Sequence, residues 1–268
     1  MGFFGKLFEK KECSLCGGEI GLLGNRKLED GNCCKTCAGK LSYWFDERRH
    51  STVDQIKEQL ACREENRKAL DAFRPAKSFG EEYALKAELE NGVPVRFVVA
   101  RTDDYREENA DLIPFSQVTD FSIEIEDEEE ELMRENEKGE EVSYNPPRYE
   151  YRYDFYARIH TNIPYCDDIR FRLNSETVTI QIVRMSFARD LDPTTYPAYQ
   201  QKKAVCEELE ELFRAGIQGL PLPDYAPVAQ PAPQPPVSEP APAGPKFCPN
   251  CGAPADGGKF CQSCGSRL

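Results

Sequence analysis

Four cysteines near the start of the chain form two C-x-x-C pairs, Cys13 with Cys16 and Cys34 with Cys37. Two thiolates separated by two residues can bind one ion from a tight turn, and the small residues after each pair let backbone amides approach the sulfurs. Two such turns on one Zn²⁺ make a closed tetrahedral site, which builds structure rather than catalysing a reaction. A disulfide pair and a redox C-x-x-C are the alternative interpretations.

The far end of the chain repeats this pattern. Lys246-Phe-Cys-Pro-Asn-Cys-Gly252 and Lys259-Phe-Cys-Gln-Ser-Cys-Gly265 share one order of residues. Their cysteines predict a second zinc site with four ligands: Cys248, Cys251, Cys261 and Cys264. A module of about twenty residues buries too little to fold without metal. Phe247 and Phe260 are expected to cover the ion. We therefore predict two structural Zn²⁺ ions per chain.

The remaining cysteines lie outside these pairs: Cys33, Cys62, Cys166 and Cys206. Most of the twelve cysteines belong to C-x-x-C pairs and no export signal precedes them, so we expect the reducing cytoplasm. Cys33 adjoins the ligand Cys34 and is interpreted as an apolar filler. The alternatives are that Cys33 replaces a ligand or responds to oxidation.

The formal net charge of the chain is −13. Such a field repels phosphate backbones, so nucleic-acid binding by the whole chain is disfavoured. A local cationic group in the first ribbon keeps nucleic-acid binding open as an alternative: Arg26, Lys27, Lys35, Lys40, Arg48 and Arg49.

Helical patterns flank a central region of strands. Thr52 and Gln55 form a capping box, which predicts a helix to about Phe73. From about residue 79 apolar residues alternate, which indicates an antiparallel sheet with a turn at 91–92. Residues 169–173 and 178–182 are expected to pair as a hairpin. A second amphipathic helix is predicted over 198–215.

Two segments have a biased composition. Residues 126–141 are rich in glutamate and are expected to form a mobile, solvated insertion, with a docking strip for a basic partner as the alternative. Residues 221–245 alternate proline with small residues, as in Ala232-Pro-Gln-Pro-Pro236. This composition is typical of a semi-stiff tether in polyproline II, and the alternative is a ligand for an aromatic groove.

Three parts of the chain resemble known families. Residues 12 to about 80 closely resemble the bacterial family catalogued as domain of unknown function 4428, on the C-x-x-C pairs, Ile20-Gly-Leu-Leu-Gly-Asn-Arg-Lys-Leu28 and Trp44-Phe-x-Glu-Arg-Arg-His-Ser-Thr52. This resemblance implies zinc at the first four cysteines and no assigned activity. Residues 79 to about 216 are similar in architecture to the bacterial pleckstrin-homology type of small barrel. The C-terminal end resembles a short zinc-ribbon module.

Together these patterns predict an α+β chain of several domains. The expected order is a flexible tip (1–11), a zinc ribbon plus helix (12–78), an antiparallel pleckstrin-homology-like β domain with a C-terminal helix (79–217), a Pro/Ala-rich linker (218–245) and a zinc ribbon (246–268).

The sequence contains no motif that indicates catalysis. His50 and His160 are far apart, and neither a G-x-S-x-G nor a Walker motif is present. We therefore expect no enzyme, but a cytoplasmic zinc-binding adaptor or scaffold with protein partners. The alternatives are a zinc ribbon that binds nucleic acid and a barrel that associates with a membrane. A minor alternative for the N-terminal tip is transient contact with a membrane through Phe3, Phe4, Leu7 and Phe8.

Overall fold

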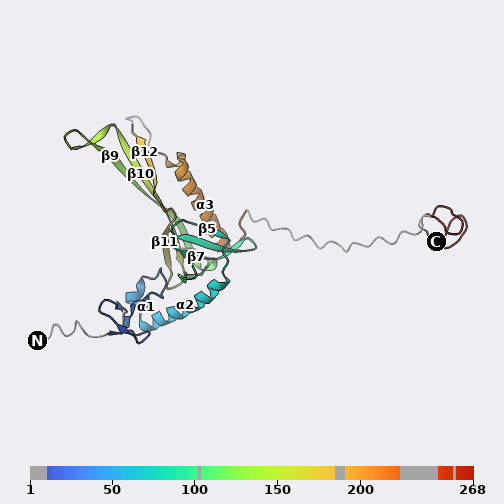
Figure 1. Cartoon of the computed structure of the whole chain (residues 1–268), viewed down its shortest axis with the longest axis horizontal. Helices are drawn as coiled ribbons and strands as arrows, with labels where there is room; N and C mark the ends of the chain where they lie inside the picture. Colours follow the sequence, from blue (N-terminus) through green and yellow to red (C-terminus); the bar gives the residue numbers. More distant parts are fainter. Residues whose placement is uncertain (1–10, 102–103, 185–190, 224–246, 256–257) are drawn as a thin grey trace. The chain divides into compact units, whose positions relative to one another are not determined.

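The computed structural model describes residues 11–101, 104–184, 191–223, 247–255 and 258–268. The chain divides into two compact units, Met1–Ala226 and Pro227–Leu268 (Figure 1). Residues 1–10 of the predicted tip and residues 224–246 of the predicted linker lie outside the described residues. The expected combination of few helices, antiparallel sheets and a cysteine cluster near each end is confirmed.

The first unit begins with two short hairpins and a helix of one turn: β1 (Lys11–Glu12), β2 (Glu19–Ile20), β3 (Arg26–Lys27), β4 (Asn32–Cys33) and α1 (Lys35–Ala38). β1 pairs with β2, and β3 pairs with β4, so a short hairpin lies between the two cysteine pairs. Their small core is built around Leu28, Cys33 and Ile56, none of which is solvent-exposed.

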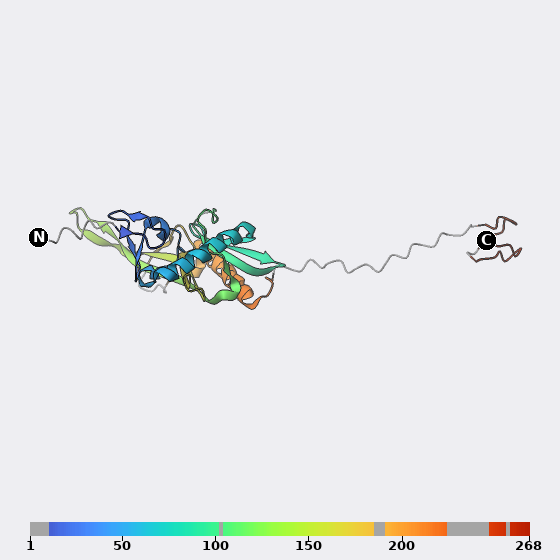
Figure 2. The ribbon, with the colours of Figure 1, turned by 90° about the horizontal axis from the view of Figure 1, so that it is seen from below.

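A short 3-10 helix, η2 (Glu47–His50), leads into α2 (Val53–Ala72). The capping box is confirmed, because the Thr52 hydroxyl accepts from the Gln55 N–H and the Gln55 side chain accepts from the Thr52 N–H. Figure 2 shows α2 running along the first unit. Its N-terminal half packs on the ribbon through Ile56, and its C-terminal end packs Leu70 and Phe73 on the strand region.

Arg63, in the middle of α2, is buried with only 5% of its surface exposed. Its guanidinium pairs with Asp111 and donates to the Asn109 carbonyl. Ser42, which follows the ribbon, donates to the other Asp111 oxygen at 2.7 Å. Burial raises the pKa of Asp111, while Arg63 and Ser42 act in the opposite direction. This network joins ribbon, helix and strand region through one ion pair.

The first sheet has four strands in the order β5-β6-β7-β8: β5 (Lys77–Phe79), β6 (Ala84–Glu90), β7 (Val93–Ala100) and β8 (Ile113–Pro114). The turn between β6 and β7 lies at Asn91 and Gly92, as predicted. Both residues have positive φ, 52° and 84°, which is the geometry of a two-residue hairpin turn.

The second sheet is built on a long hairpin that follows a 3-10 turn, η3 (Phe115–Gln117). Its strands are β9 (Val118–Glu135), β10 (Glu141–Thr161), β11 (Asp168–Arg172) and β12 (Val178–Val183). β10 pairs with β9 along one edge and, along the other, with β12 and then β11.

The expected hairpin between β11 and β12 is wrong, because each of these strands pairs with a different part of β10. Asn174 lies at the junction between them. Its carbonyl oxygen accepts from the Phe155 N–H of β10 at 2.8 Å, and its amide donates to the Glu176 carbonyl at 2.8 Å. The Asn174 side chain thus supplies a hydrogen bond that a strand would otherwise make, at the point where the pairing of β10 changes from β12 to β11.

The expectation of a mobile acidic insertion over 126–141 is also wrong. This segment forms the distal part of the β9–β10 hairpin, which extends away from α2 in Figure 1. Arginines on the neighbouring strands neutralise its glutamates: Arg152 lies 2.6 Å from Glu130, and Arg170 lies 2.6 Å from Glu126. Alternating charges on adjacent strands can therefore hold an acidic run in a sheet.

A 3-10 turn, η4 (Pro193–Thr195), precedes α3 (Pro197–Gln218), which is longer than predicted and ends at Gly219 with a left-handed cap. Phe213 of α3 stacks on Phe121 of β9, with 3.9 Å between the ring centroids. A Cβ on Gly216 would lie 2.4 Å from the Phe115 ring, so glycine permits this close approach.

The strands do not close into the expected pleckstrin-homology-like barrel. Within the described residues, two open four-stranded sheets are present, and no strand pairing joins one sheet to the other. β8 has only two residues before the chain enters η3, so strand pairing in the first sheet ends at β8. A closed barrel would need strand pairing to continue from the outer strand of one sheet to the outer strand of the other. α3 contributes to a common core with both sheets instead.

We expect Arg63→Ala to lower the free energy of unfolding by about 3–5 kcal/mol, because the substitution leaves the buried Asp111 carboxyl without its counter-charge. Urea denaturation of the full chain measures this change. The control is Lys68→Ala on the same helix, which removes the exposed pair between Lys68 and Glu65 and should leave the midpoint unchanged. Equal effects of the two substitutions would contradict this account.

Candidate metal centres

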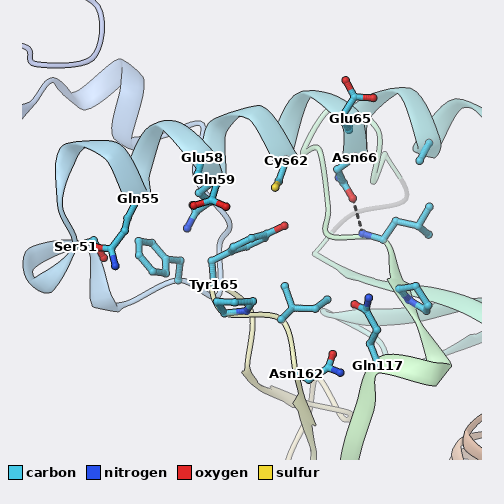
Figure 3. A pocket seen from close by; sticks show the side chains of 16 residues that line it. Ser51, Gln55, Glu58, Gln59, Cys62, Glu65, Asn66, Gln117, Asn162 and Tyr165 are labelled. Atoms are coloured by element: carbon cyan, nitrogen blue, oxygen red, sulfur yellow. Dashed lines mark hydrogen bonds between the residues drawn. The ribbon is translucent and has the colours of Figure 1, made fainter.

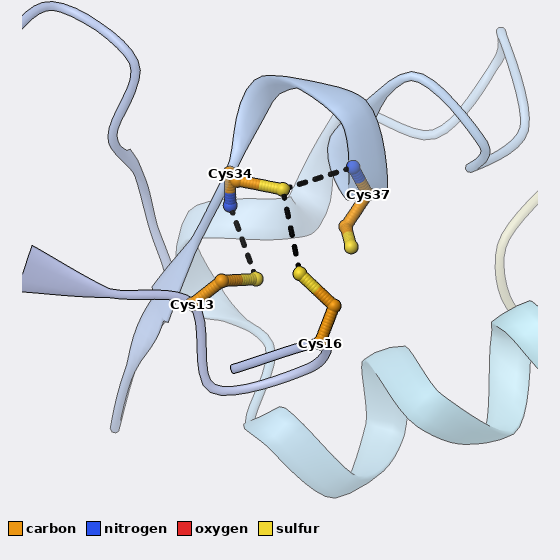
Figure 4. A group of neighbouring side chains, drawn as sticks. All are labelled: Cys13, Cys16, Cys34 and Cys37. Carbon is orange, nitrogen blue, oxygen red and sulfur yellow. Dashed lines mark hydrogen bonds between the residues drawn. The ribbon is translucent and has the colours of Figure 1, made fainter. Parts of the chain in front are cut away.

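The four predicted ligands of the first ribbon come together at one point (Figure 4). The sulfurs of Cys13, Cys16, Cys34 and Cys37 all lie within 4.8 Å of one another. Cys13 and Cys16 approach from the turn after β1, and Cys34 and Cys37 approach from the start of α1. The Cys16 and Cys34 sulfurs are 3.9 Å apart.

Backbone hydrogen bonds shape the first turn. The N–H of Cys13 donates to the carbonyl of Gly18, and the N–H of Gly17 donates to the carbonyl of Cys13, each at 2.8 Å. Gly17 has a φ of 71°, which a residue with a side chain rarely adopts. The second turn uses a helix instead, because Cys34 is the N-cap of α1 and its sulfur accepts from the Cys37 N–H at 3.4 Å.

The local electrostatics favour a thiolate at Cys13. Burial raises the pKa of this thiol, but backbone N–H groups oppose burial and lower the pKa to about 6. One of them is the Cys34 N–H, which lies 3.3 Å from the Cys13 sulfur. A thiolate is the form that binds metal.

The second unit repeats the first turn twice. The backbone N–H of Cys248 donates to the Ala253 carbonyl and that of Cys261 donates to the Ser266 carbonyl, as the N–H of Cys13 does to the Gly18 carbonyl. Gly252 and Gly265 have φ angles of 71° and 73°. The four sulfurs of the second tetrad lie within 4.8 Å of one another: Cys248, Cys251, Cys261 and Cys264.

The spacing of the sulfurs fits a tetrahedral metal ion. Bonds of about 2.3 Å from a central Zn²⁺ to four sulfurs place those sulfurs about 3.8 Å apart. The observed distances are 3.9 Å in the first tetrad and 3.7 and 3.6 Å in the second. A disulfide would need about 2.05 Å, and all twelve cysteines are free. Both tetrads are geometrically suitable for a metal ion.

Residues next to the cysteine ligands are either buried, as Cys33 is, or exposed, as Phe247 and Phe260 are. Cys33 is fully buried and is not one of the four clustered sulfurs; its thiol donates to the Cys34 carbonyl, and burial raises its pKa to about 11. This agrees with its interpretation as an apolar filler. Phe247 and Phe260, which were expected to cover the second site, leave 62% and 61% of their surfaces exposed.

A cleft of about 720 Å³ beside α2 does not include either histidine among its described lining residues (Figure 3). Its labelled side chains are mainly amides, carboxylates and hydroxyls: Ser51, Gln55, Glu58, Gln59, Cys62, Glu65, Asn66, Gln117, Asn162 and Tyr165. Burial raises the pKa of Tyr165, so its hydroxyl stays protonated at neutral pH. This lining can donate and accept hydrogen bonds, and the absence of enzymatic activity stays a prediction.

Residues 11–59 match the family described as domain of unknown function (DUF4428). The match covers the first ribbon and the beginning of α2, so the resemblance expected there is confirmed. A comparison with curated proteins and one with solved structures found no match for the chain. No helix among the described residues is long and apolar enough to cross a membrane.

The sequence did not indicate the role of Arg63 and Asp111, because charged residues in a polar stretch are usually exposed. The only available signal was indirect. Charged residues follow Arg63 in the sequence of this helix, so no apolar face was available there for packing.

We expect the purified chain to hold two metal ions, one in each tetrad. Cys16→Ser and Cys251→Ser should each remove one ion, because each substitution removes one of four ligands. Native mass spectrometry counts the ions. Cys33→Ala is the matched control and should retain both. A chain with two ions after either ligand substitution would contradict the assigned ligands.

Removal of metal should affect the two units differently. Cys248 and Cys261 are the only buried apolar side chains among the described residues of 247–268, so this module has almost no core of its own. Chelation should therefore collapse its amide NMR dispersion, while the second sheet keeps its signals. Dispersed signals of Gly252 and Gly265 in metal-free protein would exclude this dependence.

Proposed function

We propose that this protein is a zinc-binding adaptor of the cytoplasm that binds protein partners and catalyses no reaction. Zinc is supported by the donor set, because four thiolates in a closed tetrahedral arrangement suit Zn²⁺ and do not suit Ca²⁺ or Mg²⁺. The reducing compartment is supported by the twelve free cysteines.

The observation that carries the adaptor role is the exposure of Phe247 and Phe260. Each stands directly before the first cysteine of its turn. Because the metal would hold the module together, these rings are not needed for a core, and they are the large apolar side chains that it presents to solvent. Exposed aromatic residues on a small rigid module are typical anchors for a protein partner.

The first ribbon presents an equivalent apolar pair. Leu22 and Leu23 lie in the turn between β2 and β3 and are 76% and 90% exposed. Each cysteine tetrad therefore belongs to a small module that carries two exposed apolar side chains. Two such ends on one chain support a scaffold that holds two partners.

The charges favour protein over nucleic acid as the partner. The chain carries a formal charge of −13, which opposes binding to phosphate backbones. Part of the cationic group of the ribbon is also used internally. Arg48 donates to the Lys27 carbonyl at 2.6 Å, and Arg26 donates to the Leu23 carbonyl at 3.3 Å.

The test compares proteins captured from a cytosolic extract by the full chain and by three variants. Phe247→Ser with Phe260→Ser should lose a partner while retaining two metal ions, and Cys248→Ser with Cys251→Ser should lose the same partner together with one ion. Lys259→Ser, an exposed polar position of the same module, is the control. Retention of every captured protein by the phenylalanine variant would exclude this role. A gel shift with steep salt dependence would instead support the nucleic-acid alternative.

A further inference from the structure

A second candidate binding site lies between the ribbon and the first sheet. Here a groove of about 390 Å³ contains Tyr43 and Trp44 from the segment after α1, and Tyr83 from the start of β6. Val99 and Arg101 of the β7 end also line it. The lining residues of this groove include neither the exposed phenylalanines nor the exposed leucines on which the adaptor role rests.

The three aromatic rings form a stepped surface. The Tyr43 and Trp44 rings are nearly perpendicular, at 87°, with 5.0 Å between their centroids. Tyr83 lies 6.1 Å from Tyr43 and 6.3 Å from Trp44, tilted by 40° and 54°. The two tyrosine hydroxyls are hydrogen-bonded at 2.8 Å, which fixes their rings relative to each other.

This surface is available for a ligand. Tyr43 is 73% exposed, although an aromatic ring usually buries most of its area. The other side of Trp44 packs on the core that both sheets share, so the ring is held in place. Among the described residues, the structure gives the indole N–H of Trp44 no hydrogen-bond acceptor.

The charged groups that line the groove have partners within the protein, and the Glu108 carboxylate accepts from the Arg101 N–H at 3.2 Å. Arg63 is paired with Asp111 at its base, and Arg101 lies 3.5 Å from Glu82. A strongly charged peptide would find no free complement here. The groove therefore suits an uncharged, relatively rigid ligand with apolar rings and free carbonyl groups.

A proline-rich segment in polyproline II has these properties. Its rings pack on aromatic faces, its carbonyls accept hydrogen bonds from groups such as an indole N–H, and its stiffness lowers the entropic cost of binding. The sequence of this chain contains such a segment at residues 231–242, with a P-x-x-P motif from Pro233 to Pro236 and one charged residue, Glu239. These residues lie outside the described ones.

We propose that the Tyr43–Trp44–Tyr83 groove binds the proline-rich segment of a second copy of this chain. Each copy carries one groove and one ligand segment, so two copies can exchange segments. Such an exchange forms a closed dimer in which one contact strengthens the other.

The first experiment uses the fluorescence of Trp44, the single tryptophan of the chain. The receptor is the full chain with Pro233→Ala, Pro235→Ala, Pro236→Ala, Pro240→Ala and Pro242→Ala, so that its own segment 231–242 keeps a single proline, Pro231, and no P-x-x-P motif. A synthetic peptide with the sequence of residues 229–242 should shift the emission saturably. The same peptide with those five prolines replaced by alanine should not.

Variants of Tyr43 separate binding from folding, because this exposed side chain contributes little to the core. Tyr43→Ala in the same receptor should weaken peptide binding about tenfold or more, whereas Tyr43→Phe keeps the ring and should bind the peptide nearly as well. Circular dichroism and metal content should be unchanged in both. Equal binding by Tyr43→Ala, or no emission shift in any receptor, would overturn the proposal.

The second experiment tests the source of the ligand. Sedimentation velocity of the wild-type chain should show a concentration-dependent dimer, which both Tyr43→Ala and the five-proline variant abolish. A wild-type chain that stays monomeric at every concentration would overturn the assignment to a second copy, even if the peptide binds. A dimer that persists in both variants would overturn it as well.

Discussion

The buried ion pair between Arg63 and Asp111 is the interaction on which the arrangement of the first unit depends. Removing two charges from water costs several kcal/mol per ion in real proteins, so this pair is tolerated only because every part of it is hydrogen-bonded. The groups in this hydrogen-bond network, besides Asp111 itself, come from three parts of the chain: Ser42 after the ribbon, Arg63 on α2, and Asn109 before β8. A ribbon that could have been a separate domain is thereby tied to the sheet.

The metal sites and the ion pair divide the task of stabilising the chain. Each cysteine tetrad lies in a segment with at most a small core, at turns with positive-φ glycines and, in the first tetrad, with N–H groups directed at sulfur. The ribbon then reaches the larger core through α2. The C-terminal tetrad has no comparable core among its described residues, so we expect its fold to depend on a bound metal ion.

The β9–β10 hairpin shows how charge can favour a strand rather than prevent one. Glutamates repeat along β9, and arginines on β10 and β11 pair with Glu124, Glu126 and Glu130, so these carboxylates gain a counter-charge when the strands pair. The same arrangement protects the edge of the sheet, because an acidic outer strand resists pairing with another chain. Composition alone cannot reveal this, since the compensating residues are distant in sequence.

The sequence by itself determined the local features. The C-x-x-C spacing predicted both tetrads, the capping box predicted the start of α2, and the alternation of apolar residues predicted the strands. These features depend on residues a few positions apart. The tertiary structure alone decided how the strands pair, that the sheets stay open, that Phe247 and Phe260 are exposed, and that Arg63 is buried. Each of these depends on partners from distant segments, and local patterns carry no information on which distant side chain will neutralise a charge or continue a strand ladder.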